Sequence, residues 1–365
     1  MISIFSKSTI GLDLGSSAIK IIQLEQLKGR FKLIALGMAD FPKDILEINP
    51  ELRKSLIVET IKKVLKESGI KAQNVVTSLS GDAVIPRYIK TLSIPQMDLR
   101  SAILKEVDQH IPLSMDQVVL DVHQLSDTVD AEKKIDVLLV AAKNDAIQQR
   151  LEILKQAGLT PVIIDVDAFA LQNAYEINQA TGNKDETLVL LNIGAALTNI
   201  NIIEAGTTRF TRDITIAGND FTREIVKEFN LKFSEAEELK KASGSILMED
   251  EEFSLSSVKN QDDRVLRISD AMIPVLNKLL AEVRRSFDYY ETQSRKKSID
   301  RIFLSGGTAS LKNLSRYLAN KIGIPVETAG LFKNIEISSK IDSEQLDGKE
   351  LQLGVALGLA LRRLE

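Results

Sequence analysis

Two segments, one in each half of the chain, place a polar side chain before a glycine and two small residues. Residues 10–20 read IGLDLGSSAIK and residues 189–199 read VLLNIGAALTN, and the two align without a gap. Both patterns predict a strand, a tight turn and a second strand. Such a turn exposes backbone N–H groups where no side chain blocks a phosphate. Asp13 is a candidate magnesium ligand, and Lys20 returns a positive charge toward the same place.

A third glycine element follows in the second half of the chain. Gly306 and Gly307, with Thr308 behind them, predict a turn from a strand into a helix. Its N–H groups and flat surface favour an anion or a planar ring system. A single D-x-G-S segment is more often an ordinary hairpin than a phosphate site, so the inference depends on the repeat. Two matching hairpins and this turn, in that order, indicate a nucleotide-binding clamp between two lobes.

The elements that must hold these residues form two similar α/β halves separated by an insertion. Hydrophobic patterns predict strands and helices that alternate along both halves. In the first half, strands are expected at 9–15, 18–26, 31–41, 75–79 and 162–166, with helices at 51–68 and 168–178. The insertion is a β-α-β-β-α block at 85–92, 98–110, 118–125, 135–142 and 144–157. The second half has strands at 187–194, 199–204 and 301–304, helices at 220–228, 234–242, 269–293 and 309–322, and an exposed loop at 248–264.

The composition excludes several kinds of catalytic and metal-binding sites. The 365 residues contain no cysteine and no tryptophan, and His110 and His123 are the two histidines. Disulfides, thiolate nucleophiles and cysteine-ligated zinc are therefore excluded. A formal net charge of −4 gives no general attraction for nucleic acid. The longest apolar run, residues 351–361, is too short to span a bilayer and predicts a closely packed helix.

The order of the three glycine elements resembles the actin-like ATPase superfamily, with its two phosphate loops and adenosine motif. Within it, nearly the whole chain resembles the PilM family of type IV pilus assembly, which is related to FtsA. The resemblance implies a two-lobed, ribonuclease H-like α/β fold with an inserted small α+β subdomain of the FtsA 1C type. The implied boundaries are 1A at 1–83 and 161–186, 1C at 84–160, 2A at 187–233 and 299–365 with the C-terminal helix, and 2B at 234–298.

The resemblance also implies roles for individual residues with ATP and Mg²⁺ as cofactors. Asp13 would organise the magnesium ion. The residues expected to contact nucleotide are Gly15, Ser16, Ser17 and Lys20 at the β- and γ-phosphates, Gly194 and Ala195 in the second loop, Glu237 and Lys240 at the ribose and base, and Gly306, Gly307, Thr308 and Ser310 at the nucleoside. Without the family, Glu237 and Lys240 are equally consistent with a solvated i, i+3 pair.

One position departs from the family pattern. The second phosphate loop usually begins with an aspartate that helps to hold the magnesium waters, and this chain has Asn192 there. The lost charge predicts weaker metal organisation, so ATP binding is expected and at most weak hydrolysis. Asp165 and Asp167 lie at the crossover between the lobes. Asp167 is the candidate catalytic residue, with helix capping as the alternative for both aspartates.

The expected partner is the cytoplasmic N-terminal segment of a PilN-like bitopic membrane protein, bound between 1A and 1C. The family also implies other inner-membrane components of pilus assembly and a homo-oligomer. The protein is expected in the cytoplasm, peripheral to the inner membrane through its partner, without a membrane span of its own. An FtsA-like filament-forming cell-division protein is the alternative, and the ending at Glu365 without an amphipathic membrane helix favours PilM. A sugar or acetate kinase is a third class, supported only by Asp167.

Overall fold

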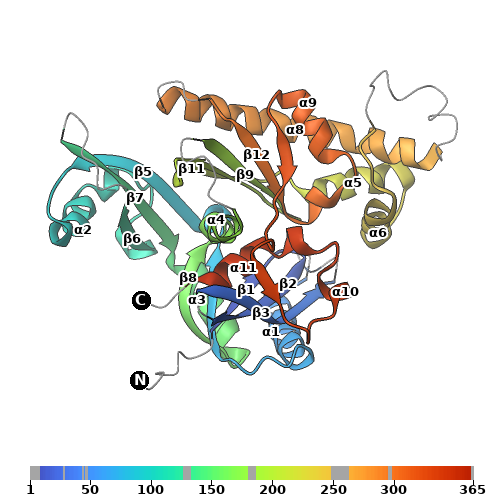
Figure 1. Cartoon of the computed structure of the whole chain (residues 1–365), viewed down its shortest axis with the longest axis horizontal. Coiled ribbons are helices and arrows are strands. Elements are labelled where there is room, and N and C mark those ends of the chain that lie inside the picture. The colour runs from blue at the N-terminus through green and yellow to red at the C-terminus, as the bar shows by residue number, and fades with distance from the viewer. Residues whose placement is uncertain are drawn as a thin grey trace.

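The computed structural model describes residues 9–27, 29–42, 45, 48–125, 133–179, 186–247, 263–294 and 298–362. Two lobes, each built on a twisted sheet, are stacked, and a smaller three-stranded sheet extends to one side (Figure 1). Most of the predicted 248–264 loop lies outside the described residues. Its last two residues, Asp263 and Arg264, begin the long helix α8, which was expected to start at residue 269.

The first lobe has a six-stranded sheet in the order β14-β3-β2-β1-β4-β8. Its strands are β1 (Thr9–Leu14), β2 (Ala18–Leu27), β3 (Arg30–Asp40), β4 (Asn74–Leu79), β8 (Thr160–Val166) and β14 (Ile335–Ile337). Helices α1 (Pro50–Glu67) and α3 (Asn144–Gln156) cover one face, and α4 (Asp167–Asn178) and α11 (Gly354–Leu361) cover the other. Because helices cover both faces of the sheet, the central strands β1 and β4 are almost fully buried.

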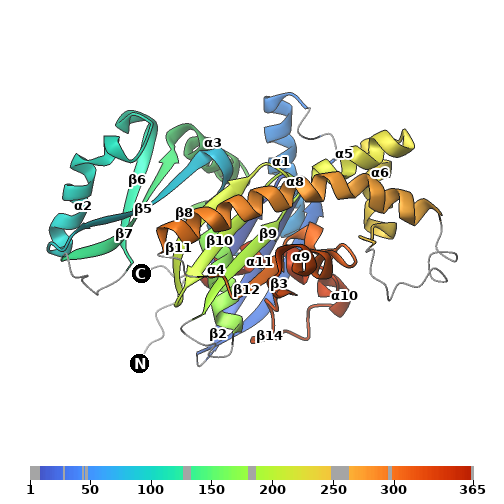
Figure 2. The ribbon, with the colours of Figure 1, turned by 90° about the horizontal axis from the view of Figure 1, so that it is seen from above.

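The second lobe has five strands in the order β11-β10-β9-β12-β13. They are β9 (Thr187–Ile193), β10 (Thr198–Glu204), β11 (Thr207–Ile214), β12 (Arg301–Ser305) and β13 (Val326–Thr328). Helices α5 (Gly218–Phe229), α6 (Phe233–Ser243), α8 (Asp263–Gln293) and α9 (Leu314–Ile322) share one hydrophobic core with this sheet. Figure 2 shows α8 crossing the sheet diagonally.

The two sheets are duplicates of one plan. In each, a hairpin of the first two strands is flanked by a third antiparallel strand on one side and two parallel strands on the other. Asp13 pairs in register with Lys20, and at the matching place Asn192 pairs with Asn199. The repeat predicted from the sequence is therefore confirmed in three dimensions.

Helices α4 and α11 lie where the two lobes meet. Leu190 and Phe303 of the second sheet belong to the same buried cluster as Leu171 of α4 and Leu357 of α11. The close approach of α11 depends on glycine, because a Cβ on Gly358 would lie 1.6 Å from the carbonyl oxygen of Ala170. The predicted close packing of the C-terminal helix is confirmed.

The inserted block forms its own sheet in the order β5-β7-β6. It contains β5 (Val84–Leu92), α2 (Gln96–Lys105), β6 (Val118–Gln124) and β7 (Lys134–Lys143), and α3 follows β7 directly. Its β-α-β-β-α order agrees with the prediction. The helix expected at 98–110 instead ends at Lys105, and a separate 3₁₀ turn (Val107–Gln109) follows.

Three strands were not expected from the sequence. β11 is polar and alternating, and β13 and β14 have only three residues each. β14 pairs with β3, and α11 contacts β1 and α4, so parts of 299–365 pack with the first lobe although that range was assigned to 2A. The helix expected at 309–322 is interrupted because Asn313 has φ of 64° and α9 starts after it. The other subdomain boundaries stay predictions.

Candidate nucleotide-binding site

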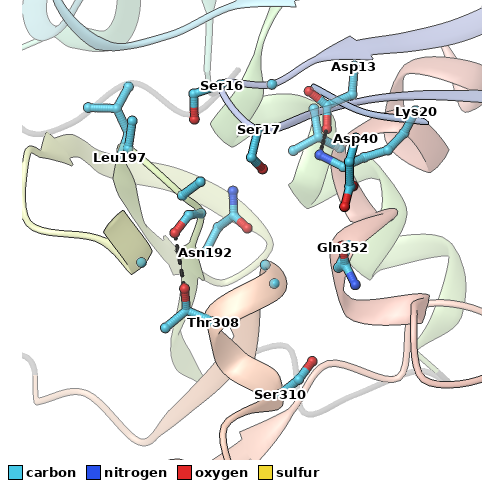
Figure 3. A pocket seen from close by; sticks show the side chains of 18 of the residues that line it. Asp13, Ser16, Ser17, Lys20, Asp40, Asn192, Leu197, Thr308, Ser310 and Gln352 are labelled. Carbon is cyan, nitrogen blue, oxygen red and sulfur yellow. Dashed lines mark hydrogen bonds and ion pairs between the residues drawn. The ribbon is translucent and has the colours of Figure 1, made fainter. Parts of the chain in front are cut away.

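A cleft of about 700 Å³ lies between the two lobes, at the turns of both hairpins (Figure 3). It brings together side chains and backbone from segments that lie far apart in the sequence. Every predicted site residue lines it: Asp13, Gly15, Ser16, Ser17, Lys20, Asp167, Asn192, Gly194, Ala195, Glu237, Lys240, Gly306, Gly307, Thr308 and Ser310. The volume is of the size that drug-sized ligands occupy.

The first hairpin supplies an ion pair and an open turn. Lys20 Nζ lies 2.9 Å from Asp13 Oδ2, and both side chains are nearly buried. The Gly15 N–H donates to the carbonyl of Ala18, which closes the turn at 3.1 Å. Figure 3 shows Ser16 and Ser17 directed toward the cleft. This end of the cleft therefore combines a cation, a carboxylate and small polar groups, which suits a phosphate with its metal ion.

The second hairpin repeats the geometry with neutral groups. Asn192 Nδ2 donates to Asn199 Oδ1 at 2.8 Å, in the place where Lys20 and Asp13 form their ion pair. The Gly194 N–H donates to the carbonyl of Leu197 at 2.9 Å, as Gly15 does in the first turn. The duplication has thus kept the turn and the cross-strand pair while it replaced both charges by amides.

A carboxylate that the sequence analysis missed lies behind the second hairpin. Asn199 Nδ2 donates to Asp213 Oδ1 at 2.6 Å, and the backbone N–H of Gly81 in the first lobe donates to Asp213 Oδ2. Asn192, Asn199, Asp213 and Gly81 therefore form one hydrogen-bonded chain between the lobes. The sequence analysis did not predict strand β11. Asp213 lies opposite Asn199 because β11 pairs with β10 in this register.

The third glycine element has the geometry that its sequence predicts. Gly306 has φ of +87°, and a Cβ there would lie 2.4 Å from the Ile193 carbonyl oxygen. Thr308 Oγ1 donates to the Gly194 carbonyl at 3.1 Å and so connects the third element to the second turn. An L side chain at Gly306 would be strained and would push the two elements apart.

Glu237 and Lys240 form a buried pair, so their interpretation as a solvated pair is wrong. Their side chains are 13% and 7% exposed and their charged atoms lie 2.7 Å apart. Lys240 also donates to the Gly218 carbonyl and to Thr222 Oγ1, and Thr222 donates to Glu237. This network holds α6 against the start of α5 and places Glu237 at the cleft.

The two aspartates of the crossover have different surroundings. Asp165 is buried away from the cleft, with Arg362 Nε at 2.9 Å. Asp167 lines the cleft at the first residue of α4. Burial, followed by the charge of Asp13, raises the pKa of Asp167 to about 6 against the hydrogen bonds of Ser78 and Ser80. Neither aspartate caps α4, because the capping position is Val166 and no side chain bonds there.

Arg150 is a further cleft residue that the sequence analysis missed. It comes from α3, and its Nη1 donates to Thr77 Oγ1 at 3.2 Å. Burial lowers the pKa of Arg150, while the charges of Asp167 and Asp13 raise it. A lone arginine on a helix at the end of the insertion carries no sequence signal of this placement.

The donor set fits a magnesium ion held mainly by phosphate and water. Among the described residues, no group of three or more His, Cys, Asp or Glu side chains is placed to hold a metal. Mg²⁺ is usually bound in proteins through one or two carboxylates together with phosphate oxygens. Asp13 meets that requirement beside the first turn, whereas the Asn192 amide is engaged with Asn199.

Comparison with known proteins decides the family. The model of the family described as type IV pilus assembly protein PilM matches residues 11–364. The chain belongs to this family. A solved structure, the PilM-PilN type IV pilus biogenesis complex, matches with a TM-score of 0.80 and 29% identity over 97% of this chain and 98% of the other. The expectation drawn from the sequence is confirmed.

More distant relatives agree on the fold. FtsA of Escherichia coli K12 is 25% identical over 214 residues, which cover 53% of this chain and 50% of that protein. The chain thus matches about half the length of these curated relatives, although FtsA of Buchnera aphidicola is 23% identical over 98% of this chain and 92% of its own. MreB5 of Spiroplasma citri bound to AMPPNP has a TM-score of 0.51 at 14% identity, covering 97% of this chain and 95% of that one. The two-lobed actin-like fold is therefore shown.

Proposed function

We propose that the protein is an ATP-binding, actin-like adaptor of the type IV pilus inner-membrane assembly complex. The observation that carries the proposal is the meeting of three glycine turns from both lobes around one cleft. Lys20 and the backbone of residues 15–17, which line this cleft, would hold the β- and γ-phosphates, and Asp13 would help to hold the Mg²⁺ ion. Gly194 and Ala195 close over the phosphates from the other lobe. The nucleoside lies between Glu237, with Lys240 behind it, and the surface formed by residues 306–310.

The bound metal would shield the negative charge of the phosphates, and the protein's own groups would position the nucleotide and accept the proton. Asp167 is the group that accepts a proton from an attacking water, because its pKa of about 6 leaves it mainly ionised at neutral pH. The chain has Asn192 in the place of a second carboxylate. Slow hydrolysis with firm binding is the consequence, since fewer charged groups organise the metal waters.

Nucleotide binding is tested by isothermal titration calorimetry of the stripped protein with ATP and Mg²⁺. We expect one site per chain, which the same titration of Lys20→Met weakens by about tenfold or more, as for loss of a charged hydrogen bond. Lys62→Met, an exposed lysine of α1 that pairs with Glu59, is the matched control. A wild-type protein without heat of binding for ATP or ADP would contradict the proposal.

The proposed partner is the cytoplasmic N-terminal segment of a PilN-like membrane protein, which gives the adaptor its place at the inner membrane. A complex with PilN is the state of the similar solved structure. No helix among the described residues is long and apolar enough to cross a membrane. The segment, synthesised as a labelled peptide, is expected to bind the full chain with and without ATP at different affinities. Equal affinities would refute the coupling between nucleotide and partner.

The filament-forming alternative makes a different prediction about assembly. The observation that supports this alternative is the similarity to FtsA, which covers half of the E. coli protein. Sedimentation with ATP and Mg²⁺ at rising protein concentration separates the two. The adaptor stays in the supernatant as a monomer or a small homo-oligomer, whereas a filament pellets above a critical concentration.

A further inference from the structure

Arg150 is a cation of the cleft that has no part in the proposed function so far. It is carried by α3, whose first residue follows the last residue of β7 in the inserted sheet. The helix packs on β8 and on α1. Arg150 is therefore a side chain of the insertion that reaches the space between the lobes.

The position of Arg150 along the cleft follows from its neighbours. The nucleoside end is marked by Glu237 and the turn at Gly306, and the phosphate end is marked by Asp13. Arg150 donates to Thr77 on β4, which pairs with β1, the strand that carries Asp13, and Arg150, Asp13 and Asp167 all line the cleft. Arg150 thus lies at the end of the cleft that is farthest from the nucleoside, where the terminal phosphate of a triphosphate would lie.

Two cations and two carboxylates line this end of the cleft, and the charge of Asp213 also acts on Asp167. The cations Lys20 and Arg150 face the carboxylates of Asp13 and Asp167. A terminal phosphate brings additional negative charge, which needs a cation that is free to turn toward it. Lys20 is held by Asp13 at 2.9 Å, whereas the hydrogen bond that the structure gives Arg150 is a neutral one to Thr77. A guanidinium forms paired hydrogen bonds with phosphate and is suited to this position.

We propose that Arg150 binds the terminal phosphate and makes the cleft prefer a nucleoside triphosphate over a diphosphate. The inference rests on the proposed nucleotide site and deepens it. Because Arg150 belongs to the segment that continues the inserted sheet, the terminal phosphate is also in contact with the part of the chain that carries that sheet. A diphosphate leaves Arg150 on Thr77.

The test compares ATP and ADP affinities, each with Mg²⁺, by isothermal titration calorimetry on the full chain stripped of nucleotide. Wild type is expected to bind ATP more tightly than ADP. Arg150→Met should weaken ATP binding by about tenfold to a hundredfold, as for loss of a charge-assisted hydrogen bond, and ADP binding by less than about threefold. Arg150→Lys keeps the charge and should retain an intermediate ATP preference, which also covers the case that the Met variant folds poorly.

Lys241→Met is the matched control. Lys241 lines the same cleft, 3.6 Å from Asp40 and 3.9 Å from Glu237, and is half exposed. Its loss should change ATP and ADP affinities by the same factor. Equal losses for both nucleotides in the folded Arg150 variants, or equal wild-type affinities for ATP and ADP, would overturn the role of Arg150 and leave the nucleotide site standing. Failure of wild type to bind either nucleotide would overturn the site and this inference together.

Discussion

The raised pKa of Asp167 predicts that replacing this carboxyl with an amide stabilises the free protein at neutral pH. Burial and the charge of Asp13 raise the pKa from 3.8 to about 6 in the folded state. The folded state therefore binds more protons than the unfolded chain between these values. Asp167 contributes its full stability below about pH 4, and that contribution is lost as the pH rises through 6.

The magnitude follows from linkage. With a pKa of 3.8 unfolded and about 6 folded, the contribution of Asp167 falls by on the order of 1 kcal/mol between pH 5 and pH 7.5. Asp167→Asn resembles the protonated carboxyl and does not titrate. The difference in unfolding free energy, variant minus wild type, should therefore be larger at pH 7.5 than at pH 5 by on the order of 1 kcal/mol.

The assay is urea unfolding at both pH values, followed by circular dichroism, without nucleotide. The difference between the two pH values is the test, because any change in packing caused by the amide is common to both. Asp288→Asn, on an exposed face of α8, is the control and should show no comparable gain at pH 7.5. A stability difference for Asp167→Asn that is the same at pH 5 and pH 7.5 would refute the reasoning. Hydrolysis of ATP, where it is measurable, should fall as the pH drops through about 6.

Three other predictions concern the site and its supports. Lys20→Met should lower the unfolding free energy by about 2 kcal/mol or more, measured by urea unfolding, because it leaves a buried carboxylate without its cation; an unchanged stability would contradict this. Gly358→Ala should lower the unfolding free energy by about 2 kcal/mol or more, since the new Cβ meets the α4 backbone. Gly307→Ala is the control: its Cβ would make only ordinary contacts, so thermal unfolding should stay nearly unchanged. The Arg209–Asp136 pair, 2.7 Å apart and partly exposed, joins β11 to the inserted sheet, and a double-mutant cycle should give about 0.5–1 kcal/mol that shrinks with added salt; a salt-independent value would argue against an ion pair.

Sequence patterns were most informative where local rules act alone. The hairpin turns at Gly15 and Gly194 need residues without bulky side chains, so their sequence identifies them directly. The amphipathic stripe of α1 and the β-α-β-β-α order of the insertion were predicted for the same reason. A three-residue strand such as β14 is too short for a period to show, and its pairing with β3 is what makes it a strand.

The burial of the Glu237–Lys240 pair illustrates a second limit. An i, i+3 pair of opposite charges looks the same in sequence whether solvent or another helix covers it. Only the packing of α6 against α5 removes it from water and satisfies Lys240 with a carbonyl and a hydroxyl. The same limit applies to Asp213, which needs β11 in register with β10 before it meets Asn199.

The sequence by itself determined the duplicated hairpins, the third glycine turn and the absence of thiol and multi-histidine chemistry, because each depends on residue type and short spacing. It also determined that one hairpin carries charges and the other amides. Only the tertiary structure decided that Arg150 joins the cleft from the insertion and that Asp213 of β11 lies behind the second hairpin, since these contacts are made between segments far apart in the chain. The raised pKa of Asp167 is likewise decided by the tertiary structure, because it arises from burial at the junction of the lobes and from the nearby charge of Asp13.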